Sequence, residues 1–349
     1  MEMNLANIWL LLIGFFLLYY AVTDGADLGV GILSLFASGE EEREAMMAAI
    51  GSTWHANQTW LVILGGMLFG AFPLFYSVVL SALYIPFILM LFGLVFRGVA
   101  FEFREHARQK SFWSFSFGIG SLITTLSQGF ALGGLLGGLT IIQGRFVGTL
   151  WEWFTPYAGL AAAGVFFGYV MLGSNTLIMK TKGKLREKSF TAARFSAVAT
   201  LVVSALVYFQ TLLRYPGMAA KWEHFPKSPM IFLVLFTFAA FVFYFISLRK
   251  KARAQPYFWN GVIIVLSFTG LSVGLYPHMI PGGKAEAMTV QDVAASPDTL
   301  RFMLVVVGVL LPIILAYTSY SYWIFRGSAG GYEEEGEEGA DAKGKRQAE

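Results

Sequence analysis

Residues 7–36 read NIWLLLIGFFLLYYAVTDGADLGVGILSLF, an apolar run long enough to cross a bilayer as one helix. At about 1.5 Å of rise per residue, about 20 residues cover the roughly 30 Å of membrane hydrocarbon. Two carboxylates, Asp24 and Asp27, interrupt this run. The stretch therefore predicts a membrane-spanning helix that carries acidic groups at depth.

The composition extends this prediction to the whole chain. Of 349 residues, 56% are hydrophobic and only 13% are charged, about half the charged fraction of soluble proteins. The sequence has no cysteine, which excludes disulfides, iron–sulfur clusters and thiolate metal sites. No metal site is predicted either, because no zinc-binding spacing relates the four histidines, which are His55, His106, His224 and His278.

Apolar runs of bilayer length recur along the chain. They predict an all-α, polytopic membrane bundle of about nine transmembrane helices, and the transmembrane domain is expected to occupy residues 1–326. The Gly-rich, acidic residues 327–349 cannot bury a core and are expected to form a disordered cytoplasmic tail. The expected spans are residues 7–36, 49–72, 76–96, 115–142, 156–179, 193–213, 230–248, 257–276 and 300–325.

The basic residues predict how this bundle is oriented. If the connections between spans alternate sides, 19 of the 25 Lys and Arg residues fall on one side. The positive-inside rule makes that side cytoplasmic, so the N-terminus is expected outside and the C-terminus inside. These charges lie in loops, which argues against a nucleic-acid partner. The six basic residues on the other side are Arg145, Arg214, Lys221, Lys227, Lys284 and Arg301.

Asp24 and Asp27 are the two carboxylates predicted deep inside a span, and no Lys or Arg is predicted at their depth. Their i,i+3 spacing puts both on one helix face. Gly25 and Gly29 form a GxxxG pattern that permits close helix approach. Because a buried carboxylate is unfavourable, such residues are usually functional, although a protonated pair that holds helices together is the alternative. If they are functional, Asp24→Asn or Asp27→Asn should lower turnover more than assembly.

The second expected span begins with an unusually polar stretch, residues 52–60, STWHANQTW. The connection to the first span is short and centred near Glu42, so facing residues should have numbers that sum to about 84. Asn57 should then lie level with Asp27 and near His55, and Trp60 level with Asp24. Two carboxylates, an imidazole and amides in the cytoplasmic half suit proton movement, so Asp24, Asp27, His55 and Asn57 are the predicted proton pathway. A capped helix start with a hydrogen-bonded histidine is the alternative.

His55 is the histidine that lies clearly within a predicted span, and no second axial ligand is predicted at matching depth. The sequence also lacks flavin and nicotinamide fingerprints. We therefore expect no haem on this chain alone and no catalytic residue of its own. Arg97 and Arg104, at the end of the third span, are expected to extend to the interface and pair locally.

Five segments together resemble the second subunit of cytochrome bd-type quinol oxidases, including the cyanide-insensitive oxidases. They occur in the family's order over nearly the whole chain. They are residues 23–31 TDGADLGVG, 54–61 WHANQTWL, 96–102 FRGVAFE, 276–281 YPHMIP, and 312–317 PIILAY with 322–323 YW.

This resemblance implies a nine-helix, haem-free subunit in the bacterial cytoplasmic (inner) membrane. Its partner would be subunit I, which carries haem b and haem d (or b-type haem only) and oxidises quinol. A structural quinone or lipid and a small accessory subunit are also implied as possible partners. By motif, Asp24 and the His55 position would belong to a proton route, and Trp60 would lie near an oxygen path.

The chain departs from the family pattern at one position. His55 stands where many members have an acidic residue, and the charge logic of imidazole is opposite to that of a carboxylate. The competing hypothesis is a proton-coupled secondary transporter with Asp24 and Asp27 as coupling-ion ligands. The sequence shows no internal repeat of the kind common in transporters.

Overall fold

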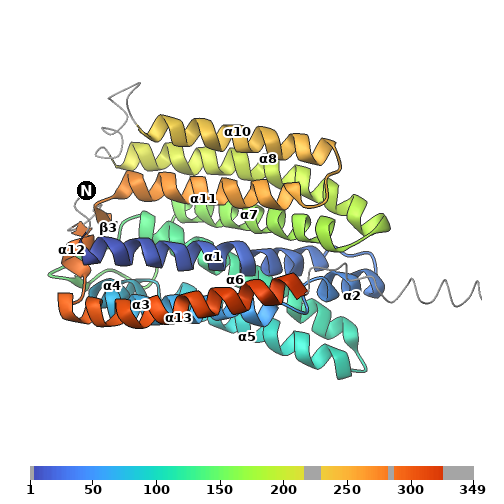
Figure 1. Ribbon diagram of the computed structural model, residues 1–349, viewed down its shortest axis with the longest axis horizontal. Helices are drawn as coiled ribbons and strands as arrows, with labels where there is room; N and C mark the ends of the chain where they lie inside the picture. The colour runs from blue at the N-terminus through green and yellow to red at the C-terminus, as the bar shows by residue number, and fades with distance from the viewer. Residues whose placement is uncertain (1–3, 216–228, 282–286, 325–349) are drawn as a thin grey trace, which may run out of the picture.

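The computed structural model describes residues 4–215, 229–281 and 287–324. Long helices run roughly side by side along the long axis of the molecule (Figure 1). Two short two-stranded ladders lie in loops, where β1 pairs antiparallel with β2 and β3 with β4. The elements are α1 (Leu5–Ser34), α2 (Glu40–Ala48), α3 (Trp54–Ala71), α4 (Pro73–Ala82), α5 (Tyr84–His106), α6 (Lys110–Leu136), β1 (Ile141–Ile142), β2 (Arg145–Phe146), α7 (Pro156–Lys180), α8 (Gly183–Arg214), α10 (Pro229–Arg249), α11 (Gln255–Leu275), β3 (His278–Ile280), β4 (Met288–Thr289), α12 (Val290–Val293) and α13 (Pro297–Ile324).

The predicted class of fold, a polytopic helical membrane bundle, is confirmed. Within the described residues, eight helices are each long and apolar enough to cross a membrane, and α3 joined to α4 makes a bent ninth candidate. Helices of this kind suit a bilayer because they satisfy every backbone polar group internally. The predicted tail, residues 327–349, and His224 lie outside the described residues.

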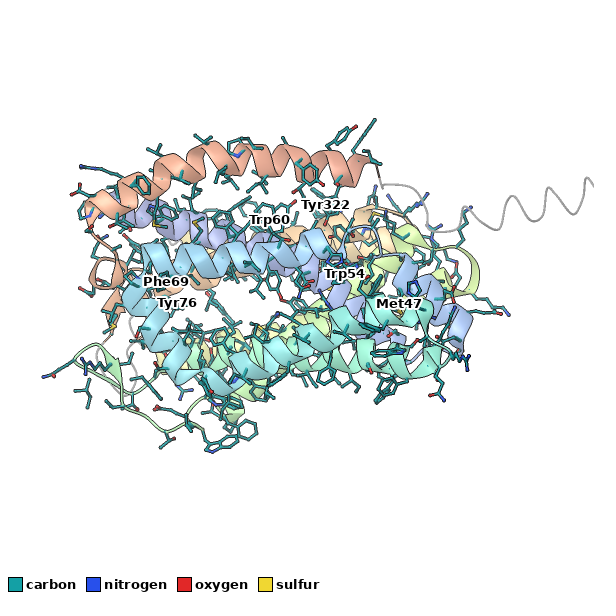
Figure 2. All side chains as sticks on the ribbon, turned by 90° about the horizontal axis from the view of Figure 1, so that it is seen from below. Met47, Trp54, Trp60, Phe69, Tyr76 and Tyr322 are labelled. Carbon is teal, nitrogen blue, oxygen red and sulfur yellow. The ribbon has the colours of Figure 1, made fainter. Side chains whose placement is uncertain are left out.

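The second and third spans differ from the prediction. α3 begins at Trp54 rather than at residue 49, and α3 and α4 meet at a bend of 119°. The bend coincides with Pro73, which has no backbone N–H and cannot continue the hydrogen-bond ladder of α3. α4 therefore takes up residues that were predicted to start the third span, and α5 runs on to His106. Figure 2 shows Phe69 and Tyr76 on either side of this bend.

α1 is the central helix of the bundle. It packs against α3, α6 and α7, and it also contacts α11 and α13. In Figure 1, α7, α8, α10 and α11 lie on one side of α1, and α3 and α13 lie on the other. Residues in the middle of α1 are therefore surrounded by other helices of the chain.

The sequence did not predict α2, which an ion-pair cluster holds against α5 and α6. Arg104 Nη2 lies 2.7 Å from Glu40 Oε1, and Arg104 Nε donates to Ser114 Oγ at 2.9 Å. Partial burial acts to raise the pKa of Glu40, but hydrogen bonds from Arg104, Ser114 and Arg43 outweigh it and lower that pKa. A carboxylate with a lowered pKa stabilises the fold above its unfolded pKa, and this contribution is lost as the pH falls through the folded value. The cluster therefore contributes at neutral pH.

Candidate functional site

The second half of α1 carries both predicted carboxylates into the centre of the bundle. Asp24 is fully buried and Asp27 is 2% exposed. Gly25 and Gly29 allow this depth, because α7 lies directly against the face of α1 that they form. A Cβ added at Gly29 would collide with the backbone of Tyr169 and Gly173, and one at Gly25 with the Tyr169 ring. The predicted role of the GxxxG pattern in close packing is thus realised against α7.

Asp24 forms a buried ion pair that the sequence interpretation missed. Arg97 Nη2 on α5 donates to Asp24 Oδ1 at 2.6 Å, and both side chains are at most 1% exposed. The expectations that no cation reaches this depth and that Arg97 extends to the interface are therefore wrong. The reason is the length of α5, which runs nine residues beyond Arg97. At the helical rise, this places Arg97 about 13 Å from the helix end.

Asp27 makes a different set of contacts, which lead to α3 and α13. Asn57 Nδ2 donates to Asp27 Oδ2 at 2.7 Å. These two residues were predicted to face each other because their numbers sum to 84. The hydroxyl of Tyr322 on α13 donates in turn to Asn57 Oδ1. A continuous hydrogen-bonded connection, Asp27–Asn57–Tyr322, therefore links the core of the bundle to its last helix.

His55 does not join this cluster. Its side chain is 71% exposed, its Nε2 lies 3.2 Å from Glu102 Oε1, and its ring stacks on Trp54 at 3.5 Å between centroids. Helical phase explains the error. Side chains two positions apart on a helix point in directions about 200° apart. His55 must therefore point away from Asp27 if Asn57 faces it. The expectation that His55 lies near Asp27 is wrong.

Trp60, predicted to be level with Asp24, is buried. It packs in an aromatic cluster with Tyr19, at 4.2 Å between ring centroids, and with Phe16, at 6.0 Å. Figure 2 shows Trp60 on α3, near the middle of the molecule. Asp24 instead pairs through Oδ1 with Arg97.

A second buried hydrogen-bonded row lies on the α6 and α7 side of α1. Gln128 Nε2 donates to Tyr20 Oη at 2.6 Å, and Tyr169 Oη donates to Gln128 Oε1 at 2.8 Å. Tyr20 precedes Asp24 by one helical turn, on the same face of α1. Sequence reasoning missed Arg97, Tyr322 and this row. Arg97 and Tyr322 lie within the segments that resemble the oxidase family, 96–102 and 322–323. No periodicity or spacing in the sequence indicated their partners.

The charges of this site do not balance if every group is ionised. The pair of carboxylates faces a single guanidinium, so the cluster is neutral when one carboxyl group retains a proton. Arginine is protonated at any physiological pH, and a net buried charge is unfavourable. Asp24 Oδ2, Arg97 Nε and Arg97 Nη1 are buried without a hydrogen-bond partner among the described residues. The arrangement can therefore hold one exchangeable proton between two carboxylates.

Comparisons with known proteins agree with this architecture. A sequence model of the family described as cytochrome bd terminal oxidase subunit II matches residues 5–325. The chain is 30% identical over 352 residues to cytochrome bd-I ubiquinol oxidase subunit 2 of Escherichia coli (strain K12), covering 90% of this chain and 93% of the relative. It is 27% identical over 334 residues to cytochrome bd ubiquinol oxidase subunit 2 of Bacillus subtilis (strain 168), covering 93% and 96%.

The fold is also similar to that of a solved structure. A chain of the bd oxidase from Geobacillus thermodenitrificans superimposes with a TM-score of 0.76 at 17% sequence identity, covering 93% of this chain and 99% of that one. The transporter alternative finds no support in these matches. The chain therefore belongs to the cytochrome bd terminal oxidase subunit II family, and it is a multi-pass subunit of a respiratory oxidoreductase in the bacterial cytoplasmic membrane.

Proposed function

We propose that this chain is the haem-free subunit of its oxidase and that it carries protons from the cytoplasm toward subunit I for the reduction of O2 to water. Membership of the family implies haem in the complex, quinol as its substrate and a partner subunit I. In our proposal every haem, whether b and d or b-type alone, is held by subunit I. The haems supply the electron transfer and oxygen chemistry there.

The histidines support a haem-free chain. The described ones, His55, His106 and His278, all lie exposed on the surface of the chain. A haem held inside this bundle would need an axial ligand directed into it. His55 instead points outward, where it pairs with Glu102.

The connection from Asp27 through Asn57 to Tyr322 is the observation that carries the proton proposal. It joins a buried carboxylate to α13, whose outward face is apolar and exposed in the isolated chain. We assign that face to subunit I. Asn57 and Tyr322, whose hydrogen bonds are donated toward Asp27, position the Asp27 carboxyl group, and the proton that Asp27 exchanges passes to the partner on this side of the bundle. Large exposed side chains on α13 include Val305, Val309, Ile313, Tyr317 and Tyr320.

The other site residues take roles that follow from their positions. Asp24 is held by Arg97 and tunes the charge of the cluster in which Asp27 exchanges its proton. His55 and Glu102, exposed beside the start of α3, form the surface group from which protons are taken up. Trp60, within the Tyr19 and Phe16 rings, lines an apolar route suited to O2. A structural quinone or lipid and a small accessory subunit complete the proposed complex.

Asp27→Asn is expected to lower the oxygen-consumption rate of the assembled complex about tenfold or more, because an amide cannot exchange the proton. Assembly should be retained, since the new side chain can still accept the Asn57 hydrogen bond through its amide oxygen.

Tyr322→Phe, which removes the hydroxyl donor, should also lower the oxygen-consumption rate. Asp24→Asn should also reduce turnover more than assembly.

Thr200→Val is a suitable control, because Thr200 is a buried polar residue on α8, away from this network. Oxygen uptake is measured with a quinol substrate, and haem content normalises the amount of assembled complex. Full turnover in both Asp27→Asn and Tyr322→Phe would refute the proton route.

The proposed orientation has a separate test. The chain has no cysteine, so each introduced cysteine is its single labelling site. A membrane-impermeant maleimide applied to intact spheroplasts should label Gln291→Cys at the external end and not Lys184→Cys at the basic, cytoplasmic end. Both should react after lysis. The reverse pattern would invert the orientation and, with it, the side from which protons are drawn.

A further inference from the structure

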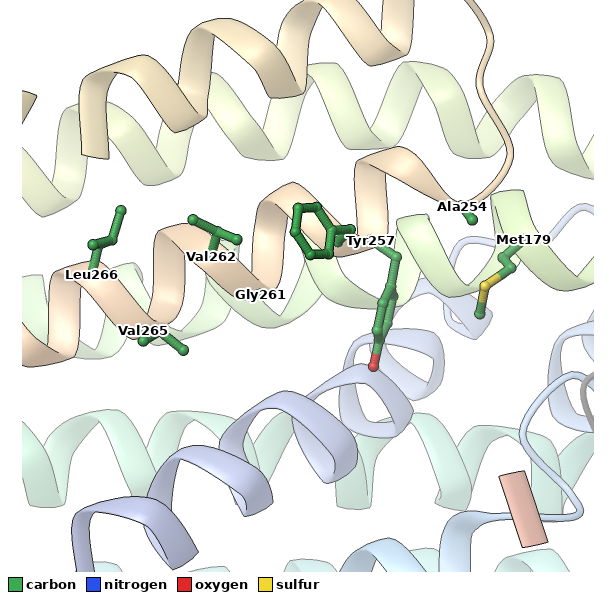
Figure 3. Close-up of a pocket in the computed structure, with 8 residues that line it drawn as sticks. Met179, Ala254, Tyr257, Gly261, Val262, Val265 and Leu266 are labelled. Atoms are coloured by element: carbon green, nitrogen blue, oxygen red, sulfur yellow. The ribbon is translucent and has the colours of Figure 1, made fainter. Parts of the chain in front are cut away.

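An open apolar groove runs along the outside of α11, away from the acidic cluster. Its volume is about 600 Å³, in the range of ligand-binding clefts. Gly261 leaves the backbone of α11 bare in the middle of the groove, and a Cβ there would have no heavy atom within 4 Å. We refer to this feature as the α11 groove, and its walls include Met179, Tyr257, Gly261, Val262, Val265 and Leu266 (Figure 3).

The length of the α11 groove matches one leaflet of a bilayer. In Figure 3 its lining begins at Ala254 and Met179, where α11 starts and α7 ends, and extends to Leu266. Twelve residues of helix separate Ala254 from Leu266, which corresponds to about 18 Å. Half of the roughly 30 Å hydrocarbon core is about 15 Å. An extended acyl chain therefore fits from the interface to the middle of the membrane.

The interfacial end of the α11 groove is cationic. Lys180 directly follows Met179 in sequence, and Arg253 directly precedes Ala254. Arg253 Nε donates to the Met179 carbonyl oxygen at 2.8 Å. This hydrogen bond brings Arg253 to the end of α7, where Lys180 follows Met179. An anion bound there would lie near two cationic side chains.

We propose that the α11 groove binds an anionic phospholipid of the leaflet at the basic end of the bundle. One acyl chain lies along Gly261 and Val265, and the phosphate contacts Arg253 and Lys180. The charge at the end of the groove selects this occupant over a neutral isoprenoid quinone, which offers no anionic group for two cations. Juxtamembrane basic residues attract anionic lipid in this way. The proposal rests on the lipid included in the proposed function, to which it gives a place and a headgroup charge, and it is independent of the proton route.

The test uses the assembled oxidase complex in nanodiscs and two photoreactive lipids with identical diazirine-bearing acyl chains. One has a phosphatidylglycerol headgroup and the other phosphatidylcholine. After irradiation, mass spectrometry quantifies labelling of the segment 254–266. We expect the phosphatidylglycerol probe to label this segment several-fold more strongly than the phosphatidylcholine probe.

Two variants separate the headgroup contact from the acyl contact. Arg253→Gln should reduce the preference for phosphatidylglycerol about fivefold, equivalent to about 1 kcal/mol for one basic residue. Gly261→Leu should fill the groove and reduce labelling by both probes. Arg108→Gln, in the α5–α6 loop, is the charge control, and Gly159→Leu, where an added Cβ also meets no heavy atom within 4 Å, is the volume control.

Each result decides the matter. A phosphatidylglycerol preference that is lost in Arg253→Gln and kept in both controls supports the site. Equal labelling by the two probes, or labelling that Gly261→Leu leaves unchanged, would reduce the contact to ordinary boundary lipid and overturn the proposal. Displacement of the phosphatidylglycerol probe by a neutral quinone would overturn it in favour of a quinone site.

Discussion

Asp24→Leu is expected to prevent assembly of the complex or to destabilise it by about 3–5 kcal/mol, the usual effect of removing one member of a buried ion pair. The guanidinium of Arg97 would remain buried, and the one hydrogen bond that Arg97 Nη2 makes to Asp24 would be lost. Arginine cannot relieve this by deprotonation. The yield of haem-containing complex and its thermal unfolding midpoint measure the effect.

The double variant Asp24→Leu/Arg97→Met is the decisive control. It replaces both partners by apolar side chains, which is often neutral for a buried pair. We expect it to recover most of the assembly lost in Asp24→Leu, but with low turnover because Asp24 is absent. Assembly as poor as in the single variant would show that the pair is not what limits stability. Asp24→Asn should be milder, since an amide oxygen can still accept from Arg97.

Gly29→Ala is expected to have the second largest effect, a loss of stability of about 3 kcal/mol, the upper end of the usual range for overpacking. The added methyl group would meet the carbonyl group of Tyr169 and the amide nitrogen of Gly173. Both are backbone atoms of α7, so no side-chain rotation can relieve the collision, and α1 must separate from α7. The Asp24–Arg97 pair depends on the position of α1, so assembly should fall with stability.

A graded series of glycine variants tests this explanation. Gly25→Ala should be less severe than Gly29→Ala, because its methyl group would meet the ring of Tyr169, which is a side chain. Gly168→Ala on α7 should be tolerated, since a Cβ there has no heavy atom within 4 Å. Thermal unfolding midpoints in detergent give the order. Equal behaviour of Gly29→Ala and Gly168→Ala would contradict close α1–α7 packing.

Local sequence was sufficient wherever the chain connection itself constrains the structure. Asn57 was predicted opposite Asp27 from the midpoint of the connection between the first two spans. The hydrogen bond between their side chains confirms this prediction, although the connection contains the unpredicted helix α2. His55 was misplaced by the same rule, which considers depth along a helix and ignores the direction in which a side chain points. Trp60 shows the same limit, because its neighbours are the rings of Tyr19 and Phe16.

By itself, the sequence determined that the chain is a membrane bundle and where most of its helices lie, because a bilayer requires long apolar helices whose backbone bonds are internal. It also determined that Asp24 and Asp27 lie at depth. Only the tertiary structure decided their partners. Arg97 is 73 positions from Asp24, and Tyr322 is 265 positions from Asn57. Contacts between such distant residues depend on how α5 and α13 pack around α1, and that packing follows from side-chain shape and close backbone approach rather than from hydropathy.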